Sequence, residues 1–254
     1  MGTVVCLGKN LHIMKQCPIC DYVDSRFDTG GFDLQRLESL KVIGGGRRNN
    51  AICPGCGSSD RERLVYLYLV RQAEVFDHGA EHLTVLHVAP ERRLRSIFGE
   101  RSNMTYITAD LYRSDVDARI DICEIPESNE TYDVIICNHV LEHVDDDRRA
   151  MRELFRVMKH GGFGVFQVPI SPTIEGTLED PEADTPEQRL RLFGQPDHVR
   201  IYGPDYADRL AEAGFAVERF SWKRNRRRFG GLWNRYALIR DELLHVARKA
   251  APAN

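Results

Sequence analysis

The sequence predicts an α/β protein, in which a parallel sheet has helices on both faces and follows a small cysteine-containing unit. Two observations carry this prediction. From Leu83 onward, short apolar runs alternate with helical stretches, which is the pattern of strands and helices in a parallel sheet. Before that point, four cysteines form two Cys-Pro-x-Cys pairs, which is typical of metal-binding turns.

Composition narrows the class of protein. The chain has 254 residues, of which 42% are apolar and 29% charged, and this usage is globular. The 35 basic and 38 acidic residues give a net charge of −3, which argues against nucleic-acid binding over the whole surface but allows a local basic patch. No apolar run reaches the roughly 18 residues of a membrane span, and the first residues of the sequence do not show the pattern expected of a secretory signal peptide. With an odd number of cysteines, seven, we expect a cytoplasmic protein with reduced thiols and no membrane partner.

The paired cysteines predict a metal site. Each Cys-Pro-x-Cys turn directs two sulfurs into one place, and four thiolates are the tetrahedral set that Zn²⁺ prefers. Iron, or a redox or unmetallated site, remains an alternative. With four protein ligands the zinc would stabilise the fold and would not activate water. The ligands are Cys17, Cys20, Cys53 and Cys56.

We therefore predict a zinc ribbon over residues 1–60. The 32 residues between the two cysteine pairs are long enough for a small hairpin, with strand-like pieces at Tyr22, at Phe27 and from Leu37 to Ile43. Ser58-Ser59-Asp60 can cap a helix from about Arg61 to Phe76, within a connecting segment over residues 61–82.

Residues 83–254 form the larger predicted domain. The expected strands are Thr84–Val88, Thr105–Ala109, Tyr132–Cys137, Phe163–Val168, Ala216–Phe220 and Tyr236–Arg240, and the expected helices are Arg93–Phe98, Asp146–Met158 and Pro204–Ala213. Residues 171–196, with four prolines and six acids between Glu175 and Glu187, interrupt this alternation. They form either a solvated loop or a lid-like insertion.

An ordered series of motifs carries a family resemblance. In chain order these are Val85–Glu91 (VLHVAPE), Tyr106–Asp110, Asp121-Ile122, Tyr132–Val144 (YDVIICNHVLEHV), Leu154–Gly162 and Ala213–Phe215. With these motifs residues 83–254 resemble the class I S-adenosylmethionine-dependent methyltransferases of the methyltransferase-11-like group. The resemblance implies a Rossmann-like, mostly parallel seven-stranded sheet, S-adenosylmethionine as cofactor, and methyl transfer as the reaction.

The resemblance also implies which residues bind the cofactor: His87, Val88, Ala89, Pro90, Glu91, Asp110, Leu111, Asp121, Ile122 and Asn138. Where the family has a G-x-G-x-G loop, this chain has Ala89, Glu91 and Arg93, so Glu91 becomes the candidate partner for the cofactor's ammonium. Asp110, at a strand end, is suited to the ribose hydroxyls. Asp121 can accept from the adenine amino group, with Ile122 over the ring.

Three histidines are candidates for the base that a hydroxyl acceptor requires. His198 is the preferred one, and His139 and His143 follow the fourth expected strand. Arg200 could orient an anionic acceptor. His139, Glu142 and His143 would also share one face of a helix, where they could hold a second metal.

The acceptor is the open part of the prediction. We favour a hydroxyl or amine of a small molecule or glycan. RNA, recognised with the help of the zinc unit, is the alternative substrate, because the chain is similar to a family of ribosomal RNA guanine methyltransferases in having an N-terminal four-ligand zinc motif, although the ligand spacing differs. Lys223–Arg228, between Trp222 and Phe229, could bind phosphates and stack on bases, although such a hairpin tip is more typical of a solvated charge run. A non-catalytic adaptor built from the same two units is the third possibility.

Overall fold

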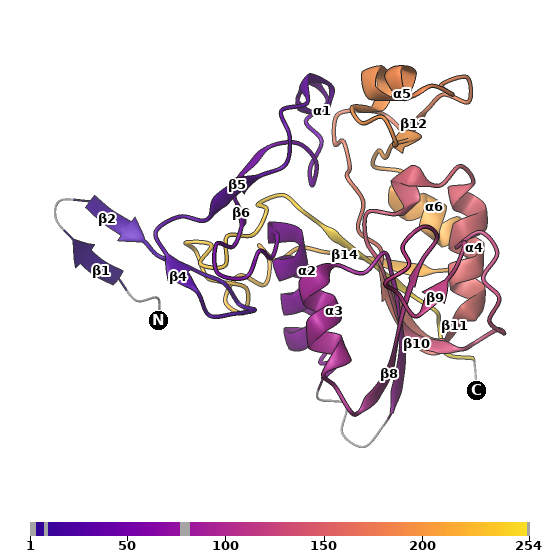
Figure 1. Ribbon diagram of the computed structural model, residues 1–254, viewed down its shortest axis with the longest axis horizontal. Helices are drawn as coiled ribbons and strands as arrows, with labels where there is room; N and C mark the ends of the chain where they lie inside the picture. The colour runs from indigo at the N-terminus through magenta and orange to yellow at the C-terminus, as the bar shows by residue number, and fades with distance from the viewer. Residues whose placement is uncertain (1–3, 8–9, 77–81, 253–254) are drawn as a thin grey trace.

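A seven-stranded sheet forms the centre of the protein in the computed structural model, which describes residues 4–7, 10–76 and 82–252 (Figure 1). The strand order is β14-β15-β11-β10-β7-β8-β9, and β15 runs antiparallel to its two neighbours while the remaining pairs are parallel. The predicted fold class is confirmed. The strands are β7 (Leu83–Val88), β8 (Met104–Asp110), β9 (Ala118–Arg119), β10 (Tyr132–Cys137), β11 (Met158–Val165), β14 (Ala216–Phe220) and β15 (Leu244–Arg248).

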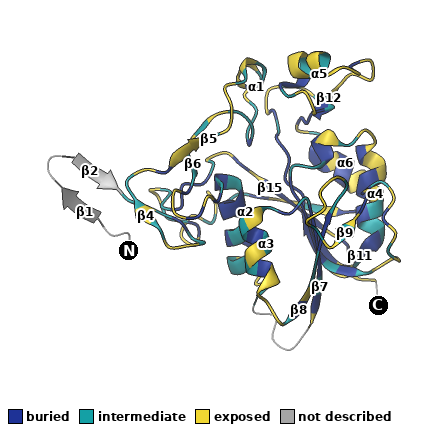
Figure 2. Ribbon diagram, in the orientation of Figure 1, coloured by how far each residue is buried: buried dark blue, intermediate teal, exposed yellow. Residues whose placement is uncertain are grey.

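Helices cover both faces of this sheet because successive strand residues point to opposite sides. Val85 and Val134 pack in the apolar cluster that includes α2 (Asp60–Arg71) and α3 (Arg92–Gly99). Leu86 and Ile135 pack in the cluster that includes α4 (Asp147–Val157) and α6 (Tyr206–Glu212). The two helix pairs lie on either side of the sheet in Figure 1, and the strands between them are the most buried part of the chain (Figure 2).

The register of the central strands brings their carboxyl ends to one edge. Val88 of β7 lies opposite Cys137 of β10 and Ala109 of β8. The residues that follow these three strands are therefore neighbours in space, and this edge is where open α/β sheets bind ligands.

The N-terminal unit consists of short antiparallel ladders beside α2. These are β1 (Val4–Leu7) with β2 (Asn10–Ile13), β3 (Lys15–Gln16) with β4 (Val23–Asp24), and β5 (Asp28–Gly30) with β6 (Arg48–Ile52). The expected strand from Leu37 to Ile43 is wrong. The segment contains the short helix α1 (Gln35–Ser39), because Leu37 is buried against Phe193 and its neighbours, and Ile43 forms an isolated bridge with Ile170.

The helix after the second cysteine pair begins as predicted. Ser59 accepts a hydrogen bond from the Glu62 backbone, and the Glu62 side chain accepts one from the Ser59 backbone, which is a capping box. The helix ends at Arg71, five residues before the expected Phe76.

Arg63 of α2 explains why the last expected strand, Tyr236–Arg240, is wrong. Its fully buried guanidinium donates to the carbonyls of Tyr236 and Ala237, and to three carbonyls of the N-terminal unit, those of Asn50, Ala51 and Ser58. Ala237 also has a left-handed backbone, with φ 51°. Because the Tyr236 and Ala237 carbonyls accept hydrogen bonds from Arg63, residues 236–240 do not join the sheet. The seventh strand of the sheet is β15.

The acidic stretch 171–196 is partly ordered into regular structure. It contains β12 (Leu178–Glu179), which pairs with β13 (Arg200–Ile201), and α5 (Pro186–Phe193), which has a capping box at Thr185. α5 lies against α1 of the N-terminal unit, where Arg36 Nε donates to the Leu192 carbonyl at 2.9 Å.

The basic stretch Lys223–Arg228 lies between two consecutive antiparallel strands, β14 and β15, but not at a tight hairpin turn. It lies in a series of turns within the long connection from β14 to β15. The flanking Trp222 and Phe229 are buried, so neither ring is free to stack on a base. Among the described residues, no helix is both long and apolar enough to cross a membrane.

Candidate functional site

The carboxyl edge of the sheet carries two strained residues. Ala89 directly follows β7 and has φ 47°, and His139, the second residue after β10, has φ 55°. Residues other than glycine rarely adopt this backbone conformation, and those that do are often found at functional sites. Ala89 therefore keeps the sharp turn that glycine would make easily.

Glu91 lies at the centre of this edge. Its Oε2 is 2.6 Å from His87 Nε2, and its Oε1 accepts from Asn138 Nδ2 at 3.1 Å. His87 is itself fixed by the Tyr106 hydroxyl, 2.8 Å from Nδ1. Burial alone would raise the pKa of Glu91. The hydrogen bonds from His87 and Asn138 and the charge of His87 outweigh burial, so the pKa of this carboxyl lies below its ordinary value. The side chain is 23% exposed, so an anionic carboxylate faces the edge.

Two acids lie at the same edge: Asp110 is the last residue of β8, and Asp121 follows β9. Asp110 Oδ1 accepts from the backbone of Tyr112 at 2.8 Å and of Arg113 at 3.0 Å, which leaves Oδ2 without a bond from the described residues. Leu111, next to it, is half-buried. Asp121 is exposed, and its Oδ1 accepts from the Cys123 backbone at 2.8 Å.

The other predicted cofactor-binding residues are more buried. Val88 and Ile122 pack in the apolar cluster under the edge, and Pro90 is buried, with its carbonyl accepting from Arg113. Asn138 is 4% exposed and also accepts from the Gln167 backbone at 3.2 Å. The structure thus brings Glu91, Asp110 and Asn138 together at one edge.

His139 is paired with a buried acid. Its Nδ1 lies 3.2 Å from Glu142 Oε1, and its Nε2 is buried without a hydrogen-bond partner among the described residues. Arg61 of α2 lies 3.1 Å from the same Nδ1, and this guanidinium also donates to the Gly44 carbonyl. Burial and the Arg61 charge lower the pKa of His139, so the ring is neutral near neutral pH.

Three residues at this edge did not emerge from the sequence: Arg61, Gln167 and Glu242. Each has a buried atom without a partner among the described residues, namely Arg61 Nε, Gln167 Oε1 and Glu242 Oε2, as Glu142 Oε2 also has. Gln167 Nε2 donates to Glu242 Oε1 at 2.7 Å, and burial raises the pKa of Glu242 to about 7. The position of Gln167 just beyond β11 was the available signal for it, whereas Glu242 lies in an irregular connection without one.

His143 and His198 lie in contact, with ring centroids 4.7 Å apart. His198 is 3% exposed, and burial lowers its pKa to about 4. His143 is exposed, and its Nδ1 is 3.1 Å from the Asp197 carbonyl oxygen. The expected α-helical face of His139, Glu142 and His143 is wrong, because Leu141–His143 is a 3₁₀ turn, η1, preceded by the left-handed His139.

Arg200 is not free to orient an acceptor. Its side chain is 3% exposed, and it donates to the carbonyls of Leu141, Val144 and Asp145. Its Nε bonds Glu179 at 3.2 Å. The donors of this guanidinium therefore hold the turn η1 in place.

The four predicted metal ligands converge at the N-terminal unit. Their sulfurs lie within 4.8 Å of one another, and the pairs Cys17–Cys56 and Cys20–Cys53 are each 3.7 Å apart. A tetrahedron with Zn–S bonds of about 2.3 Å has edges of about 3.8 Å, so the geometry fits zinc. Burial raises the pKa of the Cys20 and Cys53 thiols, while the Ser58 hydrogen bonds help to lower the pKa of Cys56 against the effect of burial.

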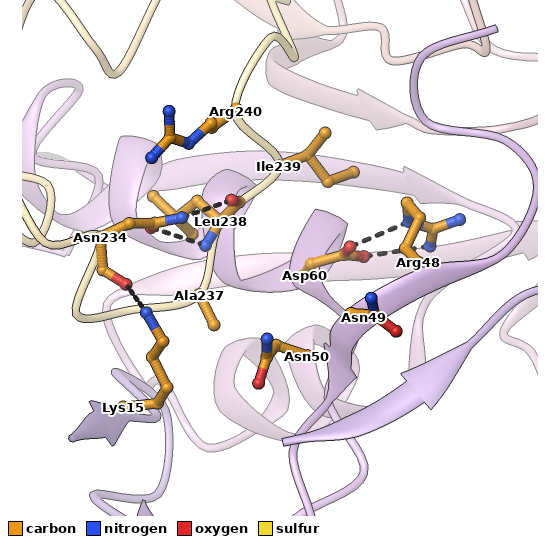
Figure 3. Close-up of a pocket in the computed structure, with 10 residues that line it drawn as sticks. All are labelled: Lys15, Arg48, Asn49, Asn50, Asp60, Asn234, Ala237, Leu238, Ile239 and Arg240. Carbon is orange, nitrogen blue, oxygen red and sulfur yellow. Dashed lines mark hydrogen bonds and ion pairs between the residues drawn. The ribbon is translucent and has the colours of Figure 1, made fainter. Parts of the chain in front are cut away.

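A cavity of about 190 Å³ lies elsewhere, between β3, β6, the start of α2 and residues 234–240 (Figure 3). Arg48 and Asp60 form a bidentate ion pair on one side of it, and Lys15 donates to the Asn234 carbonyl on the other. None of the predicted cofactor-binding or catalytic residues lines this cavity.

Comparison with known proteins identifies a family whose sequence profile this chain matches. The sequence profile of the family described as "Methyltransferase domain" matches residues 61–219. The uncharacterised methyltransferase YcgJ of Bacillus subtilis is 32% identical over 76 residues, which is 30% of this chain and 28% of that protein. The 27-O-demethylrifamycin SV methyltransferase of Amycolatopsis mediterranei is 30% identical over 138 residues, which is 48% of each chain.

The chain thus spans less than half the length of the curated relatives it matches. Among solved structures, the CurJ carbon methyltransferase is 16% identical, with a TM-score of 0.48 over 74% of this chain and 54% of that one. A likeness this low supports no inference about the activity.

Proposed function

This chain belongs to the methyltransferase-domain family, and we propose that it transfers a methyl group from S-adenosylmethionine to a hydroxyl or amine of a small metabolite or glycan. The observation that carries the proposal is the convergence of Glu91, Asp110 and Asn138 at the carboxyl edge of β7, β8 and β10. In a parallel α/β sheet this edge is the ligand-binding edge.

The residues at this edge fit the cofactor without a glycine-rich loop. The Glu91 carboxylate, partly exposed and held anionic by His87, suits the ammonium of the methionine moiety. Asp110 Oδ2 is available to the ribose hydroxyls, and the exposed Asp121 is available to the adenine amino group. When bound, S-adenosylmethionine supplies a methyl group on a sulfonium, so the chain has to align the acceptor and remove its proton.

We assign the role of base to His139 in preference to His198. A proton on His139 Nδ1 can donate to the Glu142 carboxylate, which leaves Nε2 free to take the acceptor's proton. Arg61 does not need the ring as a partner, because it donates to the Gly44 carbonyl. His198, by contrast, is buried against His143.

The buried polar atoms around His139 favour a polar acceptor. Arg61 supplies a donor and Glu142 and Gln167 supply acceptors, while Glu242 Oε2 can accept, or donate when the carboxyl is protonated, and none of these atoms has a partner among the described residues. Hydroxyl and amino groups satisfy both kinds of atom, because they donate and accept. An RNA acceptor is less well supported, since Trp222 and Phe229 are buried and Lys223 is paired with Asp241.

A methyl-transfer screen tests the acceptor. The full chain is incubated with S-adenosylmethionine carrying an isotopically labelled methyl group, and with panels of hydroxylated metabolites, amines, glycans and RNA. We expect the label in a small molecule or glycan. We also expect the triple variant Arg226→Gln/Arg227→Gln/Arg228→Gln to turn over that acceptor within a few-fold of wild type.

The RNA alternative makes an opposite prediction. If the five cations of Lys223–Arg228 each neutralised one phosphate, the logarithm of the RNA affinity would fall with the logarithm of salt with a slope of about −3.5. Label in RNA, with such a slope that is lost in the triple variant, would reverse the assignment.

We also propose that the residues Cys17, Cys20, Cys53 and Cys56 hold one structural Zn²⁺. The support is the convergence of the four sulfurs at spacings that match a tetrahedral ion. A non-catalytic adaptor would hold the same zinc but bind no S-adenosylmethionine, so cofactor binding separates the two functions.

A further inference from the structure

We propose a second metal site, in which Glu142, His143 and His198 bind a divalent transition-metal ion beside the acceptor. One nitrogen from each ring and one oxygen of the carboxylate lie within 4.8 Å of one another. Three side chains of these types, from η1 and from the segment before β13, are a two-histidine, one-carboxylate set, which leaves coordination positions open.

The Glu142 carboxylate needs a partner that the described residues do not provide. Its side chain is 2% exposed, and Oε2 has no hydrogen bond while Oε1 faces His139. A buried charged oxygen without a partner costs free energy. A cation at this position would remove that cost.

His143 is oriented as a metal ligand would be. Its Nδ1 lies 3.1 Å from the Asp197 carbonyl oxygen, so this nitrogen donates and Nε2 keeps its lone pair. Metal-binding histidines commonly donate their second nitrogen to a carbonyl or carboxylate in this way. The exposed position of His143 gives an ion a path from solvent.

The turn that carries two of the ligands is held rigidly. Arg200 donates to the carbonyls of Leu141 and Asp145 at 2.9 Å, and Tyr202 donates to Leu141 at 3.2 Å. The Val199 backbone donates to the Glu142 carbonyl at 3.0 Å, which fixes the segment of His198 beside Glu142. Arg200 and Tyr202 are therefore positioning residues for the site.

Two imidazoles and one carboxylate determine which divalent ions this site would prefer. Imidazole nitrogens favour first-row transition ions such as Mn²⁺, Fe²⁺ and Zn²⁺ over Mg²⁺ and Ca²⁺, which prefer oxygen ligands. The thiolate site is distinct, because soft sulfur ligands do not favour Mn²⁺. The role rests on the proposed function: an open position on the ion would take an acceptor oxygen and lower its pKa.

Manganese binding tests the site without any enzymatic assay. The full chain is first dialysed until elemental analysis finds one Zn²⁺ per chain, the amount that the thiolate site holds, because excess zinc would compete with Mn²⁺ for the imidazole nitrogens. It is then titrated with Mn²⁺, and free Mn²⁺ is measured by electron paramagnetic resonance. We expect one Mn²⁺ per chain, with an affinity at least 10-fold weaker in His198→Gln and in His143→Gln. His160→Gln is the matched control, since His160 also lies 3.2 Å from a carboxylate, Glu130, and its loss should leave Mn²⁺ affinity unchanged.

Folding is checked for each variant by circular dichroism and thermal unfolding. Because His143 is exposed, His143→Gln keeps the test valid if His198→Gln fails to fold. No Mn²⁺ bound to the wild type, or equal binding by wild type and folded His143→Gln, would overturn the proposal. Neither outcome depends on methyl transfer, so failure of this site and failure of the proposed function are distinguishable.

Discussion

At the scale of single residues, the buried carboxyl of Glu242 makes the stability of the folded chain depend on pH. It is 2% exposed, and its Oε2 has no partner among the described residues. Burial raises its pKa to about 7 from an ordinary value of 4.5, against the opposing charges of Arg61 and Arg48. Between about pH 4.5 and 7 the folded chain therefore holds a proton on Glu242 that the unfolded chain has lost.

The first prediction follows from this proton. Below pH 4.5 both states are protonated; as pH rises to about 7 only the folded state keeps the proton, so the free energy of unfolding falls by about 3 kcal/mol across this window. Glu242→Gln cannot titrate, so its free energy of unfolding should not show this fall with pH. Urea unfolding of both proteins between pH 4.5 and 8 measures the two free energies. If they changed with pH in parallel, the raised pKa of Glu242 would be contradicted.

The second prediction concerns His139 as the base. His139→Gln removes the free Nε2 and should lower kcat by about 10²–10⁴-fold, the usual contribution of a general base. Affinity for S-adenosylmethionine should stay within a few-fold, because His139 is not among its proposed contacts. The measurement is steady-state kinetics on the acceptor found by the screen, with His160→Gln as control, and a kcat equal to wild type would exclude His139.

At the scale of elements, α2 connects the two parts of the chain through Arg63. The third prediction is that Arg63→Lys destabilises the protein by about 2–6 kcal/mol. An ammonium has three donors, so at least two of the five buried carbonyls lose their bond, at about 1–3 kcal/mol each. Chemical denaturation measures the loss, with the exposed Arg224→Lys as control, and a change below 1 kcal/mol would refute the role.

Elements with a clear apolar pattern were predictable. β7 and β10 are continuous apolar runs buried on both faces, and their expected bounds agree with the structure to within one residue. Residues 236–240 have a similar pattern, yet Arg63 takes their carbonyls. Such a competitor lies 173 residues away in the chain, where local pattern gives no indication of it.

The candidate site was predictable to a similar extent. Glu91 and Asn138 follow strands and Asp110 ends one, so their position at one edge can be predicted from the topology alone. The neighbours of His139 could not be predicted in this way, because Arg61 belongs to α2 and Glu242 lies in an irregular connection. The contact between His143 and His198 depends on how the segment before β13 packs on η1.

At the scale of the whole molecule, the N-terminal unit is joined to the sheet domain by packing. Leu37 of α1 shares an apolar cluster with Phe193 of α5 and Ile201 of β13. Arg61, which follows the second cysteine pair by a few residues, reaches His139. The order of the N-terminal unit is therefore coupled to the order of the site.

The fourth prediction concerns zinc. Elemental analysis of freshly purified protein should find one Zn²⁺ per chain at the thiolate site, and Cys53→Ser should lower the yield of folded protein because the ligand set is incomplete. Cofactor affinity of the Cys53→Ser protein that does fold should change less than its yield. Absence of stoichiometric metal would contradict the site, and Cys137→Ser, at a buried cysteine outside it, is the control.

We propose that the carboxyl edge of β7, β8 and β10 binds S-adenosylmethionine. Isothermal titration calorimetry of the full chain tests it directly. We expect saturable binding of one molecule per chain, weakened by about 1.5–3 kcal/mol in Asp110→Ala, which loses charge-assisted hydrogen bonds to the ribose. Asp115→Ala, at an exposed acid paired with Arg113, should bind like wild type. No saturable binding, or wild-type affinity in Asp110→Ala, would contradict the claim.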